Sequence, residues 1–111
     1  EIPWDPLNKI FLSSNSRNFN EVKKFISTND VSTAFHDYKI RSKKSFELLD
    51  KIKHKNVFKV FPHKVFCNKN NGKTCPVHNM DNIFYFDSEH LSITGATMLQ
   101  EEVLKIINAF E

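Results

Sequence analysis

The stretch from Ile83 to Ala96 constrains the fold of this chain more than any other. It begins with Ile-Phe-Tyr-Phe, a composition typical of a short buried strand. A polar corner follows, and from about Thr94 to Phe110 the apolar residues recur at the spacing of an amphipathic helix. The sequence therefore predicts a strand, a polar turn and a helix in immediate succession. In open α/β sheets, ligands bind and chemistry takes place beyond the carboxyl ends of strands.

Two ionisable residues, Asp87 and His90, occupy this corner. Histidine is the usual base that takes a proton from a nucleophilic hydroxyl, because its ordinary pKa of about 6.5 lies close to neutral pH. An aspartate three residues earlier, across a turn, can accept a hydrogen bond from one ring nitrogen and leave the other free for the hydroxyl. In the alternative interpretation, Asp87 only caps the turn and His90 is a solvated loop residue.

Two further helices are predicted in the first half of the chain. Apolar residues at helical spacing indicate a short helix from Phe19 to about Asn29. A longer helix is expected to start from a cap at Ser32 or Thr33 and to run to about Lys55. The inner face of this longer helix is predicted to consist of Ala34, Phe35, Tyr38, Phe46, Leu49 and Ile52.

A second strand is predicted at Val57–Phe61, where Pro62 stops it, and the segment from His63 to Phe66 is expected to remain extended. The order of helix, strand, loop, strand and helix is that of the closing units of an α/β sheet. The stripe of the last helix that should face the core consists of Ala96, Leu99, Val103, Ile106, Ile107 and Phe110.

The two cysteines, Cys67 and Cys75, flank the tight-turn sequence Asn71-Gly72. We expect them to face each other across a hairpin and to form a disulfide, which fits an oxidising compartment. Two alternatives remain: the cysteines are inert thiols, or they belong to a metal site. The metal site would be a zinc site with four ligands around one hairpin, namely His63, Cys67, Cys75 and His78.

Composition limits the classes of function. The 111 residues suffice for one small domain, and no apolar run approaches the roughly 20 residues that a membrane-spanning helix needs. The net charge of +3 is a mild excess, and the basic residues from Lys39 to Lys55 are interrupted by Glu47 and Asp50, with Asp37 just before them. We therefore interpret them as a solvated surface and expect no nucleic-acid partner. Nothing in the sequence calls for a cofactor.

The corner resembles a known family. The sequence Phe-Asp-Ser-Glu-His-Leu-Ser at 86–92, with Gly-Ala at 95–96, resembles the last conserved block of SGNH (GDSL-type) hydrolases. More narrowly, it is similar to the SGNH domain appended to membrane-bound acyltransferases of the third family. In those domains a segment Asp-x-x-His-Leu-Ser-x-x-Gly-Ala follows an aromatic strand. A Phe-Cys pair and a second cysteine precede it, as at 66–67 and Cys75 here.

The resemblance implies an α/β fold, in which this chain supplies the carboxyl-terminal strands and helices of a three-layer α/β/α, flavodoxin-like sandwich. It implies that Asp87 and His90 belong to a catalytic triad. The implied activity is that of an acyltransferase or esterase that transfers or hydrolyses acyl groups, typically acetyl groups, on polysaccharide. The implied place is the extracytoplasmic side of a membrane, periplasmic or at the cell surface, on a membrane protein.

The sequence also departs from the family. The nucleophile of these enzymes lies in an amino-terminal Gly-Asp-Ser block that this chain lacks, and Ser13, Ser14 and Ser16 have no flanking glycines. We therefore expect residues 1–111 to form one domain that is the carboxyl-terminal portion of an SGNH domain and is inactive alone. Within it, 57–110 is the best-matched segment and 1–31 the poorly matched amino-terminal one.

The implied partners are the amino-terminal half of the domain, a membrane acyltransferase region and a glycan acceptor. The competing functional hypothesis is a small non-catalytic binding or structural module, which the disulfide or zinc hairpin at Cys67 and Cys75 would hold together.

Overall fold

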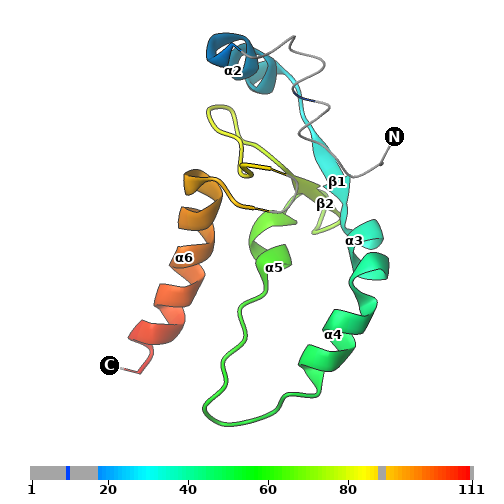
Figure 1. Cartoon of the computed structure of the whole chain (residues 1–111), viewed down its shortest axis with the longest axis vertical. Helices are drawn as coiled ribbons and strands as arrows, with labels where there is room; N and C mark the ends of the chain where they lie inside the picture. Colours follow the sequence, from blue (N-terminus) through cyan, green and yellow to red (C-terminus); the bar gives the residue numbers. More distant parts are fainter. Residues whose placement is uncertain (1–9, 11–17, 88–89, 111) are drawn as a thin grey trace.

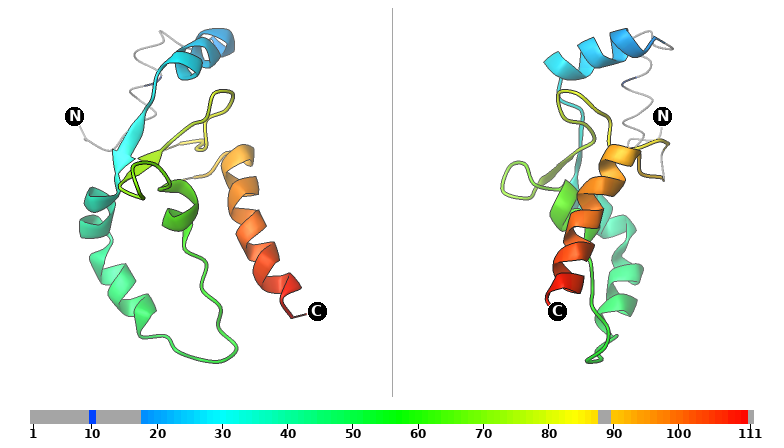
Figure 2. Two further views of the ribbon diagram at one scale, coloured as in Figure 1. Left: turned by 180° about the vertical axis from the view of Figure 1, so that it is seen from behind. Right: turned by 90° about the vertical axis from the view of Figure 1, so that its left-hand side faces the viewer.

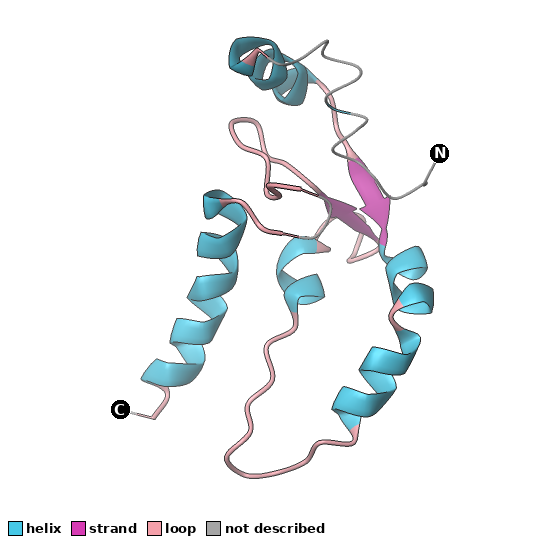
Figure 3. Ribbon diagram, in the orientation of Figure 1, coloured by secondary structure: helices cyan, strands magenta, loops and turns pink. Residues whose placement is uncertain are grey.

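The computed structural model describes residue 10, residues 18–87 and residues 90–110 (Figure 1). Helices surround one small pair of strands, which Figure 3 distinguishes by colour, so the chain has the expected α/β character. In chain order the elements are α2 (Phe19–Thr28), β1 (Ser32–Ala34), α3 (Phe35–Arg41), α4 (Lys43–Asp50), α5 (Pro62–Phe66), β2 (Thr74–Pro76) and α6 (Ile93–Asn108).

One line of backbone hydrogen bonds crosses the molecule, and we call it the central line. The amide of Val77 donates to the carbonyl of Val31 (3.1 Å), that of Phe84 donates to Val77 (2.8 Å), and that of Ser92 donates to Phe84 (2.9 Å). It thereby joins Val31, in the first half of the chain, to three successive segments of the second half. Beside its first step, β1 and β2 pair antiparallel, with Thr33 opposite Cys75.

The turn before β2 is closed by the disulfide between Cys67 and Cys75. Between the cysteines, Asn70, Asn71 and Gly72 all have positive φ angles, of 50°, 56° and 79°. This left-handed region is accessible to glycine and tolerated by asparagine, which explains the residues found there. The predicted Asn-Gly turn is therefore present, and so is the disulfide.

The buried core lies where α2 meets the strands. Ile26, Val31 and Val77 are buried together with Ile10. The helix α2 matches the predicted Phe19–Asn29 helix, and the side chain of Asn18 caps it by accepting the amide of Asn20 at 3.0 Å. The partly buried apolar residues that pack against this core are Val22, Phe25, Ile83 and Tyr85.

The predicted helix from Ser32 or Thr33 to Lys55 is wrong in two respects. Ser32–Ala34 forms β1 instead of a cap, because pairing with β2 satisfies its backbone groups. The remainder is divided at Ser42 into α3 and α4. The predicted inner face is divided as well: Phe35, Tyr38 and Phe46 contact one another, whereas Leu49 is 54% and Ile52 46% exposed.

The two predicted strands at Val57–Phe61 and Ile83–Phe86 are also not formed as regular strands. The first lies in the second half of the long connection between α4 and α5, which is neither helix nor strand and which Figure 2 shows from two sides. The second makes only isolated bridges, from Ile83 to His78 and from Tyr85 to Leu91. A strand requires a neighbour along its length, and the described residues supply none to the first segment. The segment 63–66 was expected to be extended, but it belongs to α5. This helix starts at Pro62, and proline is common in the first turn of a helix.

The helix α6 has nearly the expected bounds, but its apolar stripe is not covered. Ile107 is 50% and Phe110 63% exposed, and Val103 and Leu104 are 38% and 44% exposed. The radius of gyration of 15.9 Å also exceeds the roughly 13 Å expected for a compact domain of this length. Apolar faces of α4 and α6 are thus open in this chain.

His63 lies in an aromatic cluster that joins α3, α4 and α5. Its ring is 5.1 Å from that of Phe35, 5.3 Å from Phe46 and 5.6 Å from Phe61, measured between centroids. Burial lowers the pKa of His63, and the neighbouring Lys64 lowers it further. The residue is therefore a packing partner of aromatic rings.

Removing the disulfide tests how strongly it holds the turn. We expect the double substitution Cys67→Ser and Cys75→Ser to lower the free energy of unfolding by about 2 kcal/mol, because the bridge closes a short loop in the unfolded chain. Urea unfolding followed by circular dichroism measures this. An equal stability of both proteins would show that the bridge constrains the unfolded state little.

Acidification tests the aromatic cluster. Because the pKa of His63 is lowered in the folded chain, the unfolded chain binds a proton more readily. Its contribution to stability is complete above the ordinary pKa of about 6.5 and is lost as the pH falls below it. We expect His63→Phe to keep the ring packing and to flatten the loss of thermal stability between about pH 7 and pH 5. An unchanged slope in the variant would contradict this.

Candidate active site

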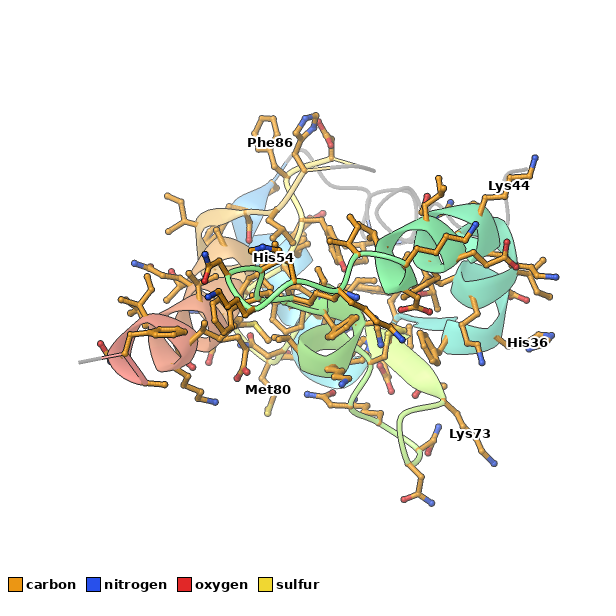
Figure 4. All side chains as sticks on the ribbon, turned by 90° about the horizontal axis from the view of Figure 1, so that it is seen from below. His36, Lys44, His54, Lys73, Met80 and Phe86 are labelled. Atoms are coloured by element: carbon orange, nitrogen blue, oxygen red, sulfur yellow. A yellow bond between two sulfur atoms is a disulfide. The ribbon has the colours of Figure 1, made fainter. Side chains whose placement is uncertain are left out.

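The corner is a short loop closed by the backbone at its base. The amide of Phe86 donates to the carbonyl of His90 at 2.8 Å, directly beside the bridge between Tyr85 and Leu91. The loop therefore projects from the surface after Phe86 and rejoins the packed part of the chain at His90. Phe86 itself is 78% exposed and projects outward (Figure 4). Residues 88 and 89 lie outside the described part of the chain.

Asp87 and His90 contact each other across this loop. The Nδ1 atom of His90 is 2.9 Å from Oδ1 and 2.8 Å from Oδ2 of Asp87, and the His90 amide donates to Oδ1 at 2.7 Å. An ionised carboxylate only accepts hydrogen bonds, so Nδ1 carries the proton and Nε2 is the basic nitrogen of the neutral ring. The His90 side chain is 72% exposed and that of Asp87 47%.

The same geometry accommodates the simpler interpretation in part, because Asp87 also caps the turn through the His90 amide. The two roles are compatible: the amide contact fixes the carboxylate, and the carboxylate then fixes the tautomer and orientation of the ring. Chemically, the arrangement can accept a proton at Nε2 and stabilise the resulting imidazolium.

Ser92 attaches the loop to the helix that follows. Its hydroxyl donates to the carbonyl of Ile83 at 2.6 Å and accepts the amide of Gly95 at 3.2 Å. Ser92 is thus the amino-terminal cap of α6, which begins at Ile93, one residue before the predicted start. Through its amide on the central line and its hydroxyl, Ser92 fixes the position at which the chain returns from the corner.

Gly95 permits the close contact between the helix and the preceding segment. A Cβ atom at this position would lie 2.1 Å from the carbonyl oxygen of Phe84 and 3.1 Å from the side chain of Leu91. No side chain fits, and the glycine is buried. Sequence reasoning treated Ser92 and Gly95 only as parts of a motif. A serine directly before the first residue of regular helical spacing is the signal that could have shown the capping role of Ser92, because its hydroxyl accepts the amide of the residue three positions later.

No hydroxyl group of the described residues contacts the His90 ring, and Ser13, Ser14 and Ser16 lie outside those residues. The structure contains an open groove of about 540 Å³ between α5 and α6. Neither Asp87 nor His90 lines it. The corner is thus a hydrogen-bonded pair of histidine and aspartate, exposed on the surface of this chain.

The alternative zinc site is wrong. Cys67 and Cys75 are bonded to each other, and a disulfide sulfur is not a thiolate ligand. His78 is buried and structural: its Nε2 accepts the amide of Val31 at 2.9 Å and its Nδ1 donates to the carbonyl of Asn79 at 2.7 Å. In the described part of the chain no three side chains of metal-ligand type come together.

The fold and the corner together define an α/β protein with a histidine–aspartate pair in the turn before its last helix. The chain belongs to the family described as the SGNH domain that is fused to AT3 domains, whose model matches residues 5–105. Neither the curated proteins nor the solved structures contain a match to it. Among the described residues, no helix has the length and apolar character needed to cross a membrane.

Replacing Gly95 tests whether its contact shapes the corner. We expect Gly95→Ala to lower the free energy of unfolding by about 2 kcal/mol or more, because the methyl group must displace backbone at Phe84. The matched control is Ala96→Gly, at the adjacent exposed helix position, for which we expect about 1 kcal/mol from helix propensity. Thermal unfolding compares the two, and equal losses would show that the Phe84 contact is unimportant.

Proposed function

We propose that this chain supplies the general base and its orienting acid to a serine-dependent acyltransferase or esterase site of SGNH type. The single observation that carries the proposal is the contact of 2.8–2.9 Å between His90 Nδ1 and the Asp87 carboxylate, with the histidine exposed. Membership of the SGNH family supports a hydrolase-like or acyltransferase-like domain.

In the proposed mechanism, a serine hydroxyl from outside the described residues approaches His90 Nε2. As its oxygen attacks the carbonyl carbon of an acyl donor, its proton moves to Nε2 and Asp87 stabilises the imidazolium. The same proton then leaves with the departing group, which gives an acyl-enzyme. A hydroxyl of the acceptor, or water, then attacks the acyl carbon and gives its proton to Nε2. The bond from that carbon to the serine oxygen breaks, and Nε2 returns the proton to the serine.

We further propose that the 111 residues are the carboxyl-terminal portion of a three-layer α/β/α domain and are inactive alone. The open apolar faces of α4 and α6 support this, since a finished domain of this size would cover them. The fusion of the family to AT3 domains supports attachment to a membrane acyltransferase region. We also propose acetyl transfer to a polysaccharide on the extracytoplasmic side, and the disulfide fits such a compartment.

The competing hypothesis of a non-catalytic module now rests on the disulfide hairpin alone, because the zinc version is excluded. In this hypothesis Asp87 only caps the turn through the His90 amide. It is consistent with the finding that no hydroxyl of the described residues contacts the His90 ring. Catalysis in the complete protein separates the two hypotheses.

The decisive experiment replaces His90 in the complete protein. We expect His90→Ala, which removes the base, to lower acyl transfer by about 10⁴-fold or more, and Asp87→Asn, which leaves the ring in the wrong tautomer, to lower it by up to about 10⁴-fold. The measurement is the release of acetyl groups from an activated ester, together with the acetyl content of the surface polysaccharide.

The matched control is His54→Ala, because His54 is an exposed histidine on the connection between α4 and α5, apart from Phe86 at the corner (Figure 4). It should retain full activity. Full activity of His90→Ala would exclude the proposed role of the pair, whatever the other variants show.

A further inference from the structure

The register of the corner loop places Phe86 directly opposite His90. The amide of Phe86 donates to the carbonyl of His90 at 2.8 Å, and this bond lies immediately outside the antiparallel bridge between Tyr85 and Leu91. Phe86 and His90 are therefore the next opposite pair along the two segments. Opposite residues of an antiparallel pair carry their side chains on the same face, with Cβ atoms about 5 Å apart.

The face that these two side chains share is the outer one. Successive side chains along a strand point to opposite faces, and the preceding pair occupies the inner face. Tyr85 packs against the buried core, and the side chain of Leu91 lies next to the buried Gly95. Phe86 and His90 thus face outward together, and accordingly Phe86 is 78% exposed and the His90 side chain 72%.

Phe86 has no stacking partner in the described part of the chain. The ring contacts found there join other aromatic residues, and Figure 4 shows Phe86 projecting outward. The open faces of α4 and α6 can be covered by the rest of a larger domain, but the space in front of His90 has to stay accessible if this residue is to exchange protons with substrate. Phe86 borders that same space, because it lies opposite His90 on the same face.

The chemistry at His90 indicates which group meets Phe86. In the proposed mechanism a hydroxyl of the acceptor approaches Nε2, so the rest of the acceptor lies over the surface beside the imidazole. A sugar ring with equatorial substituents presents a face of axial C–H groups, which are apolar and slightly positive. The face of a phenyl ring is apolar and negative, so the two faces attract each other. An acetyl group ends in one methyl group and has no such face.

We propose that Phe86 binds the acceptor by stacking on the C–H face of a sugar ring while a hydroxyl of that sugar approaches Nε2 of His90. Phe86 is then an acceptor-binding residue that favours cyclic sugars over open-chain polyols, and it takes no part in proton transfer. This inference rests on the proposed function, because it requires His90 to act as the base at the same site.

The test measures acetyl transfer by the complete protein from an activated acetyl ester to two acceptors. Methyl β-D-glucopyranoside has a ring with equatorial substituents only, whereas sorbitol carries similar hydroxyl groups on an open chain. We expect the unaltered protein to prefer the pyranoside. Phe86→Ala should raise the KM for the pyranoside about tenfold, with a smaller change in kcat, and should change the KM for sorbitol little.

Two further substitutions identify which property of the side chain matters. Phe86→Trp keeps an aromatic face and should retain the preference for the pyranoside. Phe86→Leu keeps an apolar side chain without a ring and should lose it. The matched control is Phe19→Ala, which removes a phenylalanine of similar exposure (72%) at the start of α2 and should leave the preference unchanged.

The outcomes separate this inference from the function on which it rests. If His90→Ala abolishes transfer but Phe86→Ala keeps the preference, or if the unaltered protein has none, the stacking role is wrong and the proposed function stands. Full transfer by His90→Ala would remove both. A lower melting temperature of Phe86→Ala with equal losses for both acceptors would show a packing role instead. A changed choice between acetyl and butyryl donors would show that Phe86 contacts the acyl group, and either result overturns the inference.

Discussion

The structure depends on the central line of backbone hydrogen bonds from Val31 through Val77 and Phe84 to Ser92. Its first step joins the two halves of the chain, the next two join successive segments of the second half, and all three lie in or beside the buried core. Because an unpaired backbone group in such a place is costly, the line fixes the relative positions of its four segments. Without it, neither α2 nor α6 would have a defined place relative to the two strands.

The corner is a consequence of this line. Its last step ends at Ser92, and the same residue caps α6, so the chain must return to the core immediately after His90. A loop of this length, closed at Phe86 and His90, places Asp87 and the imidazole within hydrogen-bond distance. The orientation of the acid and the base is therefore a property of the backbone around them, and Gly95 makes the required close approach possible.

The sequence was informative where structure is local. Asn18 and Ser92 cap helices whose apolar spacing is regular, so α2 and α6 could be predicted nearly to the residue. The turn at Asn71-Gly72 and the Asp87–His90 contact likewise depend on neighbours within a few positions. Prediction failed where a distant partner decides the outcome. Ser32–Ala34 became a strand because β2 lies beside it, and Val57–Phe61 formed no strand because no neighbour is present among the described residues.

The apolar faces show the same dependence on distant partners. Spacing alone predicted that α6 buries a full stripe, and only the structure shows that its lower half meets solvent. The aromatic cluster at His63 could not be predicted either, because its four rings come from three helices and the extended segment that precedes α5. Helical periodicity identifies a face, but it does not identify what covers that face.

The contacts along α6 determine the order in which its turns unfold locally. Its first turn is fixed by the Ser92 cap and the buried Gly95. Near its end, Ile107 is 50% exposed, and the Phe58–Phe110 ring contact involves a residue that follows the helix. Local unfolding begins where such fastening is weakest, so α6 should fray from Asn108 backward. The first turns of α6, next to His90, then remain helical longest, and fraying at the end of the helix does not change the positions of Asp87 and His90.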